Sequence, residues 1–411
     1  MASHYLAHYA AQYGGQSFAQ QPFNEVDGLI CAVLSYMDFS RLYATPYHRL
    51  GDLALDPAIQ QQMTAHTYVP AHYLALLRLL TASPRFRDVQ WHQCREQFDA
   101  AAAQQFAAMT LELAPQQYYI AFRGTNSTIA GWKEDLNMSY LPVVPSQRAA
   151  VRYLHDIQSA FPGQYYLGGH SKGGNLAVYA ALHSTPAARE DIVRIFNFDG
   201  PGFLPDPEME ERYVLLAPRI TKLVPQASIF GMLLEPHQDF SVVDSDGFTL
   251  WQHDPFTWQV RGRHFVRRPK TDFLSQYTQE AITQWLQSIP REERGAVLAS
   301  LYTVVDATTL GPPMICSQSG TCGSSIMPSK LYRRQPASSG GRQRRVYGMP
   351  CGRNSRSLFI NIINFQSEPQ GSGFFYRLMA EKFLFIGLFK YFSKIVLQFS
   401  RFPSTILINT Y

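Results

Sequence analysis

The chain has 411 residues, of which 46% are hydrophobic and 16% are charged. This length and composition supply enough apolar material for one large domain or two ordinary ones, which excludes a mainly disordered protein. The formal net charge of +5 is unevenly distributed. Residues 311–411 hold 13 Lys and Arg against two acidic residues, which leaves 23 basic and 29 acidic residues in 1–310. We therefore expect an acidic globular body and a basic tail.

The cysteines and the N-terminus favour a cytoplasmic location. Only Cys31 and Cys94 lie in the first 310 residues, which is too few for a disulfide framework. The first residues lack a basic region followed by an apolar run, so they predict no secretory signal. Cys316 and Cys322 have no second pair of zinc ligands nearby. We expect no metal and no cofactor.

The segments before the tail alternate in character. Residues 1–22 are rich in Gln, Ala and Tyr and predict a loose leader before a domain over 23–310. Residues 149–161 have helical spacing of apolar side chains. Short apolar runs that alternate with such segments predict an α/β fold with a mostly parallel sheet flanked by helices. These runs cover residues 118–122, 165–167, 192–198, 220–224 and 240–243.

The tail over 311–411 has a different composition. Residues 316–358 are rich in Ser, Gly and Arg without periodicity, which predicts no packed core. The apolar segment 383–399 contains two lysines and is short for a membrane span. It allows peripheral membrane contact, and an out-of-frame extension of the reading frame is the other interpretation. No nucleic-acid motif accompanies the arginines of the tail, so we expect no nucleic-acid partner.

The sequence Gly169-His170-Ser171-Lys172-Gly173 follows an apolar run and opens directly into helix-forming residues 175–182. Strand, tight turn and helix are the setting of a nucleophile elbow, in which glycines let the neighbouring backbone approach a strained serine. The helix N-terminus also places a partial positive charge near a developing oxyanion. An ordinary glycine-rich strand–helix junction is the alternative. We predict that Ser171 is a nucleophile.

These residues resemble the elbow of the Mbeg-like bacterial proteins, which are related to the class 3 (fungal-type) lipases. The resemblance spans roughly residues 23–300, and it implies an α/β-hydrolase fold and serine-based hydrolysis of a carboxylic ester. Its further motifs are Phe23-Asn24-Glu25-Val26-Asp27-Gly28, Leu34-Ser35-Tyr36, Phe122-Arg123-Gly124-Thr125, Phe198-Asp199-Gly200-Pro201-Gly202-Phe203, Val224-Pro225, Ser228-Ile229-Phe230-Gly231-Met232-Leu233-Leu234, and Gln252-His253-Asp254-Pro255 with Trp258.

An oxyanion hole needs two donors, each contributing about 3 kcal/mol to transition-state stabilisation. One is expected to be the backbone N–H after the nucleophile, that of Lys172. The loop of Thr125 resembles the lipase segment that contributes a Ser or Thr donor, so we assign Thr125 the second role. A turn-capping threonine is the alternative. Trp132 and Asp135 match the lipase pattern after this loop, and we interpret them as packing and capping residues.

The general base must be a histidine that follows the nucleophile in the chain. His253 follows the apolar run 240–243, precedes the turn signal Asp254-Pro255, and occupies the position that matches the family. We predict it as the base. The other candidates are His183, His237 and His264.

The acid is the least determined member of the site. In class 3 lipases it precedes the Val-Pro element, but Thr221-Lys222-Leu223 carries no carboxylate here. Asp199 follows the run 192–198, at an edge position from which this fold can also supply the acid. We predict Asp199. Alternatives that stay open are Glu235, Asp239 and Asp244.

Together these residues predict a lipase- or esterase-like serine hydrolase that acts on a small-molecule or lipid acyl substrate. A non-catalytic binding or lipid-sensing protein with the same fold is the alternative. The residues specify neither the acyl chain length nor the oligomeric state.

Overall fold

The computed structural model describes residues 5–297, except 127–128, 236, 238, 274, 277–279, 281–283 and 285–287. The predicted tail over 311–411, with its apolar segment 383–399, lies outside the described residues. None of the helices in the described part of the chain is long and apolar enough to span a membrane.

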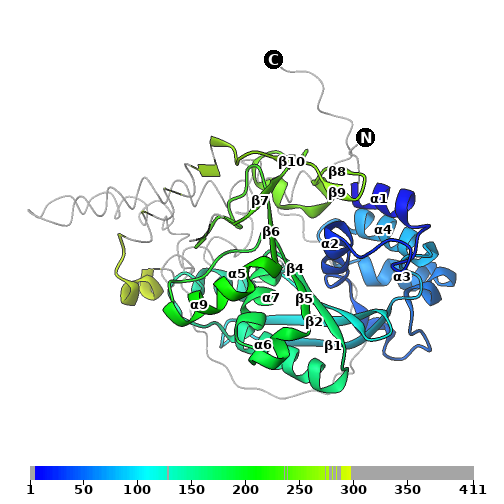
Figure 1. Cartoon of the computed structure of the whole chain (residues 1–411), viewed down its shortest axis with the longest axis horizontal. Coiled ribbons are helices and arrows are strands. Elements are labelled where there is room, and N and C mark those ends of the chain that lie inside the picture. The colour runs from blue at the N-terminus through cyan, green and yellow to red at the C-terminus, as the bar shows by residue number, and fades with distance from the viewer. Residues whose placement is uncertain are drawn as a thin grey trace, which may run out of the picture. The chain divides into compact units, whose positions relative to one another are not determined.

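Within the described residues, an eight-stranded sheet forms the centre of the molecule (Figure 1), in the order β1-β2-β3-β4-β5-β6-β7-β10. Neighbouring strands from β3 to β7 run parallel, whereas β1, β2 and β10 pair antiparallel at the two edges. The sheet strands are β1 (Gln90–Asp99), β2 (Gln104–Ala114), β3 (Gln117–Phe122), β4 (Gln164–His170), β5 (Ile192–Phe198), β6 (Ile220–Pro225), β7 (Ser241–Val243) and β10 (Arg267–Arg268). The predicted mostly parallel α/β sheet is confirmed. A separate pair consists of β8 (Val260–Arg261) and β9 (His264–Phe265).

Helices cover both faces of this sheet (Figure 1). One core contains residues of α6, α7 and α9, and the other contains residues of α1, α2, α3 and α4. The helices are α1 (Tyr5–Tyr13), α2 (Glu25–Leu34), α3 (Pro57–Thr64), α4 (Pro70–Ala82), α5 (Ile129–Asn137), α6 (Pro145–Ala160), α7 (Lys172–Leu182), α8 (Pro186–Glu190) and α9 (Pro207–Leu216). Short 3-10 helices are η1 (Phe39–Leu42), η2 (Leu50–Leu55), η3 (Ala217–Arg219), η4 (Thr249–His253) and η5 (Pro255–Thr257).

Strand β3 shows why the strand runs are visible in the sequence. Successive side chains of a strand point to opposite faces, and here Tyr119 and Ala121 enter one core while Ile120 and Phe122 enter the other. Both faces are buried, so every position of residues 118–122 is apolar rather than every second one. Full burial of each large apolar side chain stabilises the fold by about 1.5–3 kcal/mol.

The start of the chain departs from the expectation of a loose leader over 1–22. Residues 5–13 form α1, and its Leu6, Tyr9 and Ala10 are buried in a core. These three positions have the spacing of one helical stripe, which the Gln-rich composition obscured. Tyr9 also donates its hydroxyl hydrogen to Asp27 Oδ1 at 2.9 Å. The leader prediction is therefore wrong for α1.

The segment after α1 is fixed by one buried arginine. Arg85 forms an ion pair with Asp27 at 2.6 Å, and both side chains are almost fully buried. The Arg85 guanidinium also donates to the carbonyl oxygens of Gln16 and Gln21, at 3.1 and 2.9 Å. A guanidinium has five donors, so it holds several turns of irregular chain at once.

Candidate active site

Ser171 lies in a strained turn between β4 and α7. Its backbone angles are φ 60° and ψ −133°, a conformation that costs a non-glycine residue on the order of 1–3 kcal/mol. The turn is crowded, because a Cβ at Gly173 would lie 2.1 Å from the carbonyl oxygen of Phe122 in β3. The Ser171 N–H donates to Phe198 O of β5 at 2.8 Å, which holds the turn at the carboxyl edge of the sheet. Glycine at 173 is therefore needed to seat Ser171 there.

Asp199 and His253 are hydrogen-bonded to each other beside this turn. His253 Nδ1 lies 2.6 Å from Asp199 Oδ2. A carboxylate accepts the hydrogen on Nδ1, which leaves Nε2 of the neutral imidazole without a proton. Asp199 follows β5 with φ 54°, and its backbone N–H donates to Leu223 O of β6 at 2.8 Å. The backbone at the carboxyl end of β5 thus directs the Asp199 carboxylate toward His253.

Further donors hold the Asp199 carboxylate, which is 1% exposed. The Ser228 hydroxyl donates to Asp199 Oδ1. The Gly231 N–H donates to the same oxygen at 3.1 Å. A Cβ at Gly231 would lie 2.2 Å from Oδ1, so only glycine allows this approach. Charge-assisted hydrogen bonds of this kind offset the desolvation of a buried carboxylate. The sequence motif contained Ser228, but its role was not predicted.

Two rings enclose the His253 imidazole. Those of His170 and Phe230 each have their centroid 4.5 Å from it. His170 Nε2 donates to His253 O at 2.7 Å, and the Tyr36 hydroxyl lies 3.2 Å from His170 Nδ1. Burial lowers the pKa of His170 well below its ordinary value, so this imidazole stays neutral. His170, which directly precedes Ser171, therefore binds the backbone of His253. Only its place inside the motif could have suggested this role.

The hydrogen bond that general-base catalysis requires is not formed in this state. Among the described residues, none joins Ser171 Oγ to His253. Catalytic hydrogen bonds are often long before substrate binds and tighten in the reacting complex.

The loop of Thr125 passes directly over the turn at Ser171. A Cβ at Gly124 would lie 3.1 Å from Ser171 Cβ and 2.5 Å from the His170 carbonyl oxygen. Thr125 Oγ1 donates its hydrogen to Asp135 Oδ1 at 2.8 Å. Asp135, expected to be a capping residue, instead binds the Thr125 side chain. Since a hydroxyl has one hydrogen, the Thr125 hydroxyl is already committed to Asp135.

Backbone donors remain available at this position. Within the described part of the chain, neither the Thr125 N–H nor the Lys172 N–H has an acceptor. Lys172 is the first residue of α7, and the first N–H groups of a helix have no intrahelical partner. Both N–H groups flank Ser171, one from the Gly124 loop and one from the helix.

The side chain of Lys172 is buried, with 1% of it exposed. Its ammonium donates to Glu134 Oε2 and to Gln105 O, both at 2.9 Å. It also lies 3.9 Å from Asp135 Oδ1. Burial raises the pKa of Asp135 to about 6, and Lys172 is the strongest influence in the opposite direction. The sequence suggested only the backbone of Lys172.

The alternative acids contact other groups. Glu235 pairs with Lys222, and Asp244 pairs with Arg268 at 3.0 Å. Asp239 is exposed. Of the four candidate carboxylates, Asp199 is the one that contacts His253.

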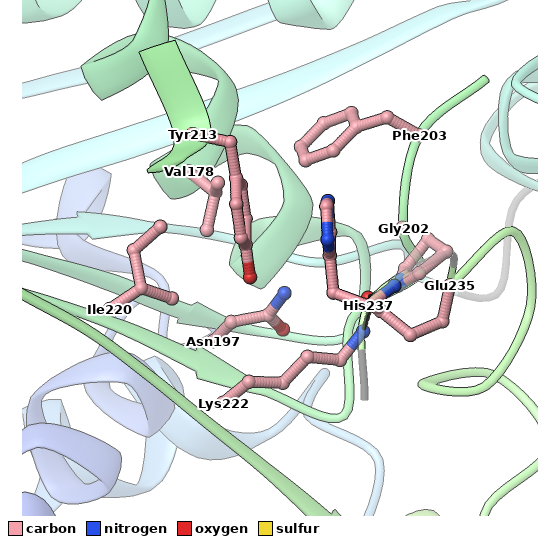
Figure 2. Close-up of a pocket in the computed structure, with 10 residues that line it drawn as sticks. Val178, Asn197, Gly202, Phe203, Tyr213, Ile220, Lys222, Glu235 and His237 are labelled. Carbon is pink, nitrogen blue, oxygen red and sulfur yellow. Dashed lines mark hydrogen bonds and ion pairs between the residues drawn. The ribbon is translucent and has the colours of Figure 1, made fainter. Parts of the chain in front are cut away.

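The Lys222–Glu235 pair belongs to a separate polar cluster beside a cavity of about 10 Å³, which is room for one water molecule. Figure 2 shows Lys222 directed toward Glu235, with the rings of Tyr213 and His237 face to face. The cavity is lined by neither Ser171 nor His253. In the described residues no cluster of three or more His, Cys, Asp and Glu is suited to a metal ion.

Solved structures that resemble the chain are lipases of low identity. M37 lipase is 15% identical, with 51% of this chain and 69% of that chain covered and a TM-score of 0.33. A lipase from Rhizopus microsporus var. chinensis is 15% identical, with coverage of 47% and 71% and a TM-score of 0.30. A triacylglycerol lipase whose catalytic centre is a serine protease triad is 17% identical, with coverage of 54% and 80% and a TM-score of 0.33.

The chain has an α/β fold in which helices cover both faces of a mostly parallel sheet. No functionally curated protein matches it. The model of the family described as Mbeg1-like matches residues 80–303, more than half of the chain. This segment contains the strained serine, the Asp199–His253 pair and the Thr125 loop, whereas the motif over 23–36 lies before it. The chain belongs to the Mbeg1-like family.

Proposed function

We propose that this chain is a serine hydrolase that cleaves carboxylic esters through an acyl-enzyme intermediate. The observation that carries the proposal is the 2.6 Å contact between His253 Nδ1 and Asp199 Oδ2, beside a serine with φ 60°. Strain of this kind persists only where the surrounding structure enforces it, and it is concentrated at functional sites. The choice of an ester rests on the resemblance of the motifs to those of class 3 lipases.

The acylation step begins at Ser171. His253 Nε2 takes the proton of the Ser171 hydroxyl while Oγ attacks the carbonyl carbon of the ester. Asp199 keeps the hydrogen on Nδ1 and stabilises the imidazolium that forms. The carbonyl oxygen becomes an oxyanion, which accepts hydrogen bonds from the backbone N–H groups of Thr125 and Lys172.

The intermediate then collapses. The bond between the carbonyl carbon and the alcohol oxygen breaks, and His253 gives its proton to the leaving alcohol. Water attacks the acyl-enzyme with His253 again as base, and the carboxylic acid leaves as Ser171 regains its proton. Asp135 acts through Thr125, because its carboxylate fixes the side chain of the residue whose N–H faces the oxyanion.

Fluorophosphonate labelling is the direct test. An activated serine attacks the phosphorus and expels fluoride, so the wild-type chain should gain the label on the peptide that contains Ser171. Ser171→Ala should remain unlabelled and should hydrolyse p-nitrophenyl esters of graded acyl length at the background rate. Full hydrolysis by Ser171→Ala would remove Ser171 from the mechanism.

A binding protein with this fold is the second candidate, favoured by the missing hydrogen bond between Ser171 and His253. A wild-type chain that neither takes up the label nor cleaves any ester in the series would support this candidate and contradict hydrolysis.

A further inference from the structure

The residue directly after Ser171 buries a full positive charge. An isolated ammonium in the protein interior is several kcal/mol less stable than in water, so a buried lysine must have compensating partners. The Lys172 ammonium has them in two elements distant in sequence, Gln105 O at the start of β2 and Glu134 Oε2 in α5. The side chain therefore links the turn at Ser171 to the helix that carries Asp135.

Glu134 accepts further hydrogen bonds besides that of the lysine. It accepts the N–H of Ser146 at 2.8 Å, the hydroxyl of Ser146 at 2.7 Å and the N–H of Gln105 at 3.0 Å. A carboxylate offers about four acceptor sites. The charge of Lys172 also acts on a second carboxylate nearby.

That second carboxylate is Asp135, whose side chain is 29% exposed. Four groups act on it: Lys172 from α7, Thr125 from the loop after β3, Glu134 from its own helix and His253 from η4. Lys172, Thr125 and His253 favour the ionised form of Asp135, and burial and Glu134 oppose it. With its pKa near 6, Asp135 is mostly ionised at neutral pH, and Lys172 contributes most to that.

We propose that the Lys172 side chain is a positioning residue for the oxyanion site: its ammonium holds Asp135 as the acceptor of the Thr125 hydroxyl and so fixes the Thr125 loop over Ser171. This inference rests on the proposed function. Lys172 then serves both donors, because its own N–H is one of them and its side chain acts through Asp135 on Thr125. A hydrogen bond to an ionised acceptor is roughly twice as strong as a neutral one. Loss of the Asp135 charge should therefore loosen the loop.

The first experiment measures the titration of Asp135 directly. Lys172→Met alone would leave Glu134 buried beside an apolar side chain, so it is combined with Glu134→Gln, which removes the buried charges as a pair. Lys172 affects the Asp135 pKa more than Glu134 does, so the double variant should raise that pKa by about one unit or more. Carbon-13 NMR of the Asp135 carboxyl group gives this shift without any need for activity.

The Lys222–Glu235 pair provides a matched control. Its side chains are 3% and 5% exposed, similar in burial to Lys172 and Glu134, and Asp135 is not among their partners. Lys222→Met with Glu235→Gln should leave the Asp135 titration where it is in the wild type. Equal shifts in both double variants would show a general loss of packing and overturn the proposal.

The second experiment follows the rate constant of fluorophosphonate labelling against pH. In the Lys172→Met/Glu134→Gln variant we expect the limb assigned to Asp135 to move upward with its pKa. At pH 5, below this pKa, labelling should slow about tenfold, because one pKa unit there changes the ionised fraction of Asp135 about tenfold. Asp135→Asn, at a partly exposed position, keeps the fold testable if the double variant does not fold. Asp135→Asn should react slowly with the fluorophosphonate at every pH tested. Its profile of rate constant against pH should lack the limb assigned to Asp135.

The outcomes separate the two proposals. An Asp135 pKa unchanged by the double variant overturns the role of Lys172, and so does a shifted pKa with unchanged labelling. A wild-type chain that resists the label overturns the proposed hydrolysis instead, while the NMR titration still decides whether Lys172 controls Asp135.

Discussion

Two aspartates flank the turn at Ser171, and they differ in how their charge is held. Asp199 lies on the side of β5 and β6, where a hydroxyl, a backbone N–H and an imidazole all donate to it. Asp135 lies on the side of β3 and α5, where it accepts one hydroxyl hydrogen and has a cation 3.9 Å away. Burial raises the pKa of Asp135 to about 6.

The two carboxylates differ in their direct donors. Three donors in direct contact replace the lost hydration of Asp199 beside His253. Asp135 has one direct donor, and its pKa of about 6 lets its charge change near neutral pH. Variants at both sites test whether this contrast in direct donors matters.

The largest expected effect comes from Asp199→Asn. The amide cannot hold the hydrogen on His253 Nδ1 in the same way, so the imidazole loses the tautomer that leaves Nε2 free. We expect kcat/KM for ester hydrolysis to fall about 10⁴-fold, as measured with the best p-nitrophenyl ester. A fall below tenfold would mean that another carboxylate supplies the acid, and Glu235→Gln is the comparison variant.

Ser228→Ala should have a smaller effect in the same direction. It removes one donor from Asp199 while the Gly231 N–H and His253 remain. A hydrogen bond to a charged group contributes about 1.5–3 kcal/mol, so kcat should fall roughly 10- to 100-fold with little change in KM. An unchanged kcat in a variant that lacks this hydroxyl would show that Asp199 is not held as tightly as the contrast requires.

Asp135→Asn should alter stability as a function of pH. The folded-state pKa is raised from 3.8 to about 6, so the folded chain binds this proton more tightly than the unfolded chain. The stability that protonation of Asp135 contributes is therefore present below about pH 4 and is lost as pH rises to 6, by about 2 kcal/mol. The Asp135→Asn variant should not show this loss of stability as the pH rises.

Urea unfolding at pH 4.5 and 7.0 measures this effect as the difference in unfolding free energy between wild type and variant. Burial also raises the pKa of Asp254 to about 6. Asp254 is present in both the wild type and the variant, so its contribution to stability cancels in the difference. A difference that does not depend on pH would place the Asp135 pKa near its ordinary value.

Thr125→Val should have the smallest effect on activity. The variant keeps the backbone N–H and loses a hydroxyl whose hydrogen is directed to Asp135. We expect labelling to slow by no more than about tenfold, compared with the 10²- to 10³-fold loss typical of a missing oxyanion donor. A loss in the larger range would show that the hydroxyl itself donates to the oxyanion.

Much of the fold could be predicted from local patterns. Strands buried on both faces are mostly apolar, and the runs at 118–122, 192–198 and 220–224 coincide with β3, β5 and β6. The predicted helix over 149–161 lies within one residue of the end of α6, which begins earlier at Pro145. Helix α1 was missed because a stripe of three apolar residues is a weak signal until a core is available to bury it.

The sequence by itself determined the turn at Ser171, because glycine spacing, a preceding apolar run and a following helix are all local features. It also marked His253 and Thr125 as candidates through their neighbours in the chain. Only the tertiary structure decided which carboxylate meets His253, since 54 residues separate it from Asp199 and four candidates had similar local settings. The same holds for Lys172, whose partner Glu134 is 38 residues away. Long-range pairing of buried charges depends on where strands and helices come together, and no local pattern in the chain specifies that.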